Sequence, residues 1–320
     1  MKKLLQKPFF KISKATLEGF LQDKGLKLSA SLAYYTIFAL GPLLLLLISL
    51  AGIFLGKDAI QGKLFSELRG FIGSDAALQI QEMLQAIELS GKSTLAFVIG
   101  IVTLVIGATS IFGEIQDSIN IIWKVKAKPK RGWLKMLKDR LLSGSMIISL
   151  GFLLVVSLVL NGAIIALTDR LMRILPDVTV VIMNAANMLI SFLVITVLFA
   201  TIFKVLPDAK IRWKDVRMGA VFTACLFLLG RYLIGLYISA SGTGTAFGAA
   251  GSIIVILVWV YYTAAILFIG AEFTQVYADY RGRDIEPADY AVHIEQKEIE
   301  QDVDVLPPQN EDVQKEDSSS

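Results

Sequence analysis

Long apolar runs that alternate with charged segments are the main pattern of this sequence. A helix needs about 20 mainly apolar residues to cross a hydrocarbon core of ~30 Å. Runs that meet this length lie at 29–55, 93–112, 141–168, 178–206, 218–240 and 251–275. We therefore predict an all-α, polytopic membrane protein with six transmembrane helices.

The first run follows a basic start, an arrangement that a cleaved signal peptide would share. It extends from Ser29 to Leu55, whereas the apolar part of a signal peptide has only ~7–15 residues. We interpret the run as the first membrane helix. The pair Gly41-Pro42 within it marks either a packing kink or a hinge.

Three segments outside the apolar runs complete the predicted organisation. Residues 1–28 carry seven lysines and apolar residues at helical spacing, so we expect a basic amphipathic helix on the cytoplasmic surface. Residues 57–92 predict two amphipathic helices on the outer face, which either cap the bundle or lie on the outer leaflet. Residues 278–320 hold 13 acidic and four basic residues and predict a disordered acidic cytoplasmic tail. The membrane domain then covers 29–277.

Lysine and arginine are distributed unevenly around the runs, and this sets the predicted orientation. Of 31 such residues, 24 fall in the alternate segments that begin with the N-terminus, six in the segments between them, and one, Arg231, inside a run. The positive-inside rule then predicts that both termini are cytoplasmic. The most basic segment, residues 124–140, indicates anionic lipid headgroups as partners, and no nucleic acid, because it is a short loop between two spans.

Composition narrows the chemistry. Charged residues make up 18% and hydrophobic residues 55%, against about 25% charged in soluble domains, so we expect much of the apolar surface to face lipid. One cysteine, Cys225, and one histidine, His293, cannot form a disulfide, a Cys/His metal site or a His-based triad. We expect no enzyme activity, no metal and no cofactor.

Polar residues at the inner ends of three predicted helices form one candidate site, because polar groups in lipid are costly and mark function or pairing. Helical spacing predicts an acidic vestibule, open to the cytoplasm, in which the carboxylates bind a cation or a proton. Its lining would be Tyr34, Tyr35, Glu114, Asp117, Glu272 and Gln275. In the alternative interpretation, Glu114 and Glu272 lie in the headgroup region, since each follows an apolar run of about 20 residues.

A second polar set lies in the predicted outer half of the membrane. It consists of Asn161, Asn184, Asn187 and Arg231. Arg231 has no carboxylate at its own depth, so we expect it to pair with a carbonyl, an outer-loop acid or a ligand. A Gly-rich turn at a similar depth has backbone N–H groups suited to an anion or a polar substrate; it contains Gly242, Gly244, Gly248 and Gly251. The alternatives are interhelical hydrogen bonds for the asparagines and a close-packed helical connection for the turn.

Three stretches of the chain carry a family resemblance: SASLAYYTIFALGPLL at 29–44, GEIQDSIN-x-IW at 113–123, and GTGTAFGAAGSIIVILVWVYYTAAILFIGAEFTQVYA at 242–278. Over about residues 10–280 the chain resembles the YihY/virulence factor BrkB family of bacterial inner-membrane proteins. The resemblance implies a multi-pass protein of the bacterial plasma membrane. Some members carry a ribonuclease label, but this sequence has no His/Asp metal cluster for that chemistry, so we do not carry the activity over.

The two polar zones at opposite depths favour a transporter or an export/permeation factor, whose substrate is an unidentified solute or lipid. The alternative is a non-transporting membrane scaffold or envelope-assembly factor that recruits partners through residues 57–92 and the acidic tail. An intramembrane hydrolase is a third hypothesis. The sequence leaves a homo-oligomer open.

Overall fold

The computed structural model describes residues 8–39, 94–128, 145, 149, 156, 176–241 and 249–295. This part of the chain is mostly helical, as predicted. The predicted outer insert at 57–92, nearly all of the predicted helix at 141–168 and most of the Gly-rich turn lie outside the described residues.

Four long helices make up the body of the described structure. They are α6 (Thr94–Ile122), α8 (Pro176–Val205), α9 (Trp213–Ser241) and α11 (Ala249–Tyr280). Each begins within a few residues of a predicted run. Among the described residues, three segments are long and apolar enough to cross a membrane: Ala185–Val205, Trp213–Ile234 and Ile254–Tyr280.

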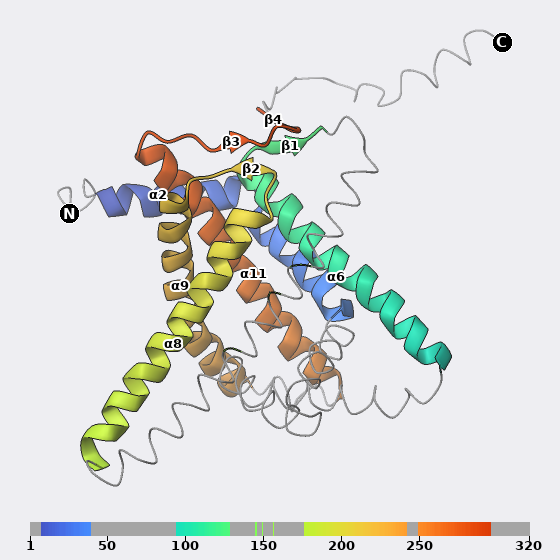
Figure 1. Cartoon of the computed structure of the whole chain (residues 1–320). Helices are drawn as coiled ribbons and strands as arrows, with labels where there is room; N and C mark the ends of the chain where they lie inside the picture. The colour runs from blue at the N-terminus through green and yellow to red at the C-terminus, as the bar shows by residue number, and fades with distance from the viewer. Residues whose placement is uncertain are drawn as a thin grey trace, which may run out of the picture.

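The basic N-terminal segment forms a helix, α2 (Pro8–Gln22), which lies across one end of the long helices (Figure 1). Ile12, Thr16 and Phe20 recur every four residues and are buried, and α2 packs against α11. The chain then bends at Lys24, which has a positive φ of 57°, and continues as a helix over residues 25–39. The predicted amphipathic helix is therefore present, and its buried face contacts protein.

Short strands lie at the same end of the bundle as α2 (Figure 1), which we call the strand end. β1 (Val125–Ala127) pairs antiparallel with β4 (Ala291–His293), and β2 (Ala209–Lys210) pairs antiparallel with β3 (Glu286–Pro287). The segment after α11, which holds β3 and β4, thus pairs with two other parts of the chain. β4 pairs with the connection after α6, and β3 pairs with the connection between α8 and α9. The fold is predominantly helical, with these strands as an addition to the predicted all-α class.

The strand pairing corrects the prediction that the whole segment 278–320 is disordered. Residues 278–295 are ordered: Ala288 N–H donates to the Asp208 carbonyl at 2.9 Å, and Ile294 N–H donates to the Lys124 carbonyl at 2.8 Å. The charge count failed here because it averaged the paired residues with a much longer acidic stretch. Residues 296–320 lie outside the described part of the chain.

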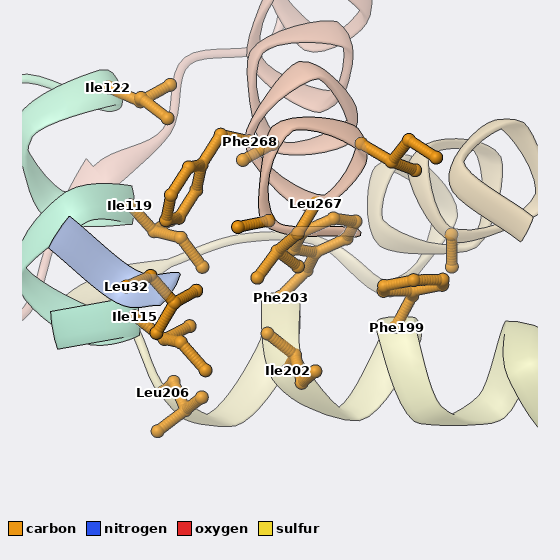
Figure 2. Close-up of a cluster of buried hydrophobic side chains, with 14 of the residues drawn as sticks. Leu32, Ile115, Ile119, Ile122, Phe199, Ile202, Phe203, Leu206, Leu267 and Phe268 are labelled. Carbon is orange, nitrogen blue, oxygen red and sulfur yellow. The ribbon is translucent and has the colours of Figure 1, made fainter. Parts of the chain in front are cut away.

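The core lies towards the strand end, where α6, α8 and α11 converge (Figure 1), and Figure 2 shows its side chains. Phe203 of α8, Phe268 of α11 and Ile119 of α6 are fully buried there. Between helices in lipid, close packing supplies much of the stabilisation, because lipid tails are as apolar as the side chains they replace.

α9 and α11 approach closely through two reciprocal Gly–Thr contacts. A Cβ on Gly219 would overlap Thr274 Oγ1, and a Cβ on Gly270 would overlap Thr223 Oγ1. Each threonine hydroxyl donates to the glycine carbonyl one turn earlier in its own helix, at 2.7 Å. Both hydroxyls are therefore satisfied, while the glycines leave room for the opposite helix.

Candidate functional site

A hydrogen-bonded cluster centred on Asp208 joins α6 to the connection between α8 and α9. Asp208 is buried, and its carboxylate accepts hydrogen bonds from Gln116 Nε2 at 3.1 Å and from Asn120 Nδ2 at 2.9 Å. Asp208 N–H donates to Asn120 Oδ1 at 2.9 Å. Because Ala288 also bonds the Asp208 carbonyl, three separate segments of the chain meet at this residue.

A second set of contacts ties the end of α6 to α2 and α11. Trp123, which is buried, donates from Nε1 to the Ala271 carbonyl at 3.0 Å. Lys124 has a positive φ of 55°, and its ammonium group forms an ion pair with Asp23, just past the end of α2. The C-terminal turns of α2 and α6 are thereby held together beside α11.

Glu272 lies in α11 next to this junction and is the candidate site residue with the most unusual surroundings. Its side chain is only 5% exposed. Its Oε1 lies against Gly19 of α2, where a Cβ would come within 2.6 Å of the Glu272 Cδ. Its Oε2 is buried without a hydrogen-bond partner in the described structure, and so is Oε1 of Gln275, one turn further along α11.

The other predicted vestibule residues have varied surroundings. Glu114 of α6 is half-buried and Asp117 is exposed. Tyr34 and Tyr35 are exposed on the helix over residues 25–39, and their rings form an edge-to-face pair with centroids 5.7 Å apart. The structure thus brings Glu272 to α2, a contact that the sequence did not suggest, and leaves both tyrosines on the surface.

The described structure covers only part of the predicted outer set. Arg231 is half-buried on α9, Asn187 is exposed on α8, and Gly251 lies within α11. The described part of the chain offers Arg231 no hydrogen bond or ion pair. Four predicted residues, Asn161, Gly242, Gly244 and Gly248, lie outside the described residues, as does the side chain of Asn184.

Sequence reasoning missed the Asp208 cluster and the Gly–Thr contacts. Gln116 and Asn120 are four residues apart and share a helical face, which a search for buried polar pairs along α6 would have found. Their partner could not be identified, because Asp208 is a loop residue far away in the sequence. The repeated spacing Gly-x-x-x-Thr, at 219–223 and 270–274, was visible but was not recognised as a packing motif.

Among the described residues, no group of three or more His, Cys, Asp or Glu side chains is arranged to hold a metal ion. His293, placed in the tail by the sequence analysis, is exposed on β4, and Cys225 is exposed on α9. Leu229, Tyr232 and Leu233 are also exposed on α9.

The long apolar helices expose aliphatic side chains, and polar side chains are buried at the strand end of the bundle. These features define a helical membrane protein. The chain belongs to the virulence factor BrkB family, whose model matches residues 16–292. The match extends into β4, in agreement with the ordered segment after α11.

Relatives from several bacteria are named UPF0761 membrane proteins. The one from Azotobacter vinelandii is 27% identical over 80% of this chain and 60% of its own length, and one from Pseudomonas aeruginosa is 29% identical over 79% and 59%. One from Vibrio vulnificus is 26% identical over 76% and 74%. The chain thus spans about three fifths of the length of the Azotobacter and Pseudomonas relatives. No solved structure matches the chain significantly.

Proposed function

We propose that the chain crosses a bacterial plasma membrane six times, with both termini in the cytoplasm. The arrangement of the described segments supports this topology. The positive-inside rule assigns α2 and the connections after α6, α8 and α11 to one side of the membrane, and these four segments lie together at the strand end (Figure 1). In this proposal the strand end is cytoplasmic.

We further propose that, in this membrane setting, the protein acts as a transporter or permeation factor for an unidentified solute or lipid. The observation that carries the proposal is the buried Glu272 carboxyl group, with Oε2 unpartnered. An isolated buried carboxylate is costly, and intramembrane ionisable groups commonly mark ion or substrate pathways. Arg231 is the second polar element of the pathway, in the outer half.

The proposal requires no catalytic step. The side chains that it uses bind and release a charged or polar group, and anionic lipid headgroups contact the exposed lysines of α2. Lys11 and Lys14 of α2 are exposed there, as is Lys24 just after it, as interfacial helices commonly show.

Flux measurements test this function. A comparison of metabolites in cells with and without the protein identifies the solute, and its uptake is then measured in proteoliposomes. We expect Glu272→Gln, Glu114→Gln and Arg231→Gln to reduce the flux, whereas Gly113→Ala, which adds a methyl group in open space, should not. Unchanged flux in all three variants would remove the proposed pathway.

A non-transporting scaffold is the second candidate, and one observation favours it. The buried side chains of Gln116, Asn120 and Asp208 are joined by mutual hydrogen bonds, as a static structural element requires. Recovery of a stable crosslinked partner, together with no flux of any candidate solute, would support the scaffold.

A further inference from the structure

We infer that Glu272 and Gln275 form a binding site for a small cation, either a proton or a monovalent metal ion such as sodium. The site lies between α11 and α2 at the strand end. Its part in permeation rests on the proposed function, whereas binding of the cation can be measured without any flux.

The two side chains present unused acceptors on one side of α11. Glu272 Oε2 and Gln275 Oε1 are both buried, and no donor in the described structure reaches either of them. Residues three apart in a helix are neighbours on its surface. A carboxylate oxygen can take up a proton, and an amide oxygen can accept the hydrogen bond of the resulting O–H group. Both oxygens can also ligate a hard cation.

The charged surroundings leave the Glu272 carboxyl group without a counter-ion of its own. The described charged groups that act on it are Asp23, Lys124 and Asp279. Lys124 is the one cation among them, and it forms an ion pair with Asp23. A buried carboxylate that lacks a partner is costly, and a bound proton or small cation removes that cost.

The closeness of α2 limits the size of the ligand. Gly19 packs directly against Oε1, and a Cβ there would come within 2.6 Å of Cδ and 3.3 Å of Cγ of Glu272. A site with no room for one added methyl group beside the carboxyl excludes organic cations on that side. On the Gly19 side, the site therefore has room for no more than a bare ion or a proton.

Two measurements on the purified full chain in nanodiscs distinguish the possible cations. Infrared spectroscopy detects the carbonyl band of a protonated carboxyl group near neutral pH. Thermal unfolding in sodium chloride, compared with choline chloride at equal ionic strength, detects sodium binding, because a ligand that binds the folded state raises the Tm. Glu18→Gln is the matched control, since Glu18 is an exposed carboxylate on α2.

If the ligand is a proton, the carbonyl band is present in the wild type and in Glu18→Gln and is lost in Glu272→Gln. If it is sodium, the sodium-dependent rise in Tm is lost in Glu272→Gln alone. Gln275→Met keeps the carboxyl group but removes one acceptor, so it should weaken the sodium response about fivefold or shift the pH midpoint of the band.

The inference is overturned if the wild type shows neither the band nor a sodium response, or if Glu272→Gln retains whichever is found. Binding without flux would instead remove the proposed transport function and leave the cation site standing. Flux that persists when the site binds no cation would remove the cation site and leave the proposed transport function standing.

Discussion

Replacing Gly219 by alanine tests how α9 packs on α11. A Cβ at this position would overlap Thr274 Oγ1 and lie 2.9 Å from Thr274 Cβ and 3.2 Å from its Cγ2. Alanine improves helix propensity by about 1 kcal/mol, but forcing a methyl group into a filled site costs about 1–3 kcal/mol. Gly113 of α6 is a matched control, because a Cβ there meets nothing within 4 Å.

We expect Gly113→Ala to raise the free energy of unfolding by about 0.5–1 kcal/mol. Gly219→Ala should be about 2 kcal/mol less stable than Gly113→Ala because of the overlap. Thr274→Ala removes Oγ1 and Cγ2 and leaves only the 2.9 Å contact. In that background, Gly219→Ala should therefore cost at least about 1 kcal/mol less than it does in the wild type.

Reversible unfolding in mixed micelles with increasing SDS, followed by circular dichroism, gives the four stabilities of this double-mutant cycle. The control variant shows the effect of helix propensity alone in the same assay. If Gly219→Ala were as stable as Gly113→Ala, or if the coupling energy with Thr274→Ala were zero within error, the reciprocal Gly–Thr packing would be refuted.

Three further predictions concern the strand end. Asp208→Ala leaves two buried donors without their acceptor and should lower the free energy of unfolding by about 3 kcal/mol, measured in the same SDS titration. Arg283→Met leaves the buried carboxylate of Asp215 unpaired, their ion pair being 2.7 Å in the wild type, and should cost about 3 kcal/mol; Lys210→Met breaks an exposed pair and should cause no measurable change. Gly19→Ala should push α2 away from α11 and raise hydrogen exchange of the α2 amides about tenfold; unchanged exchange would contradict the close contact.

The sequence predicted the long helices well because a membrane-spanning helix needs only a long apolar run, a signal contained in each segment. α8, α9 and α11 begin within about five residues of their predicted runs. The N-terminal amphipathic helix was predicted for the same reason, since the period of its buried residues is local. Three segments of the described chain are confirmed as membrane-capable.

The features that the sequence did not predict depend on contacts between distant segments. β1 and β4 each span three residues and are separated by most of the chain, so neither carries a recognisable strand pattern alone. Glu272 was a candidate from the sequence, but its neighbour Gly19 could not be known, because helical spacing gives the face of a helix and not which helix covers it. The same limit hid Asp208, whose partners lie on α6.

A single measurement tests the central claim that the Glu272 carboxyl group binds a cation used in permeation. Purified protein is reconstituted into liposomes that contain a pH-sensitive or a sodium-sensitive dye, and the decay of an imposed proton or sodium gradient, respectively, is followed for the wild type, Glu272→Gln and Gly113→Ala. We predict that the wild type and Gly113→Ala dissipate the gradient faster than empty liposomes and that Glu272→Gln does not. Equal decay for Glu272→Gln and the wild type, or a wild type that matches empty liposomes, would contradict the claim.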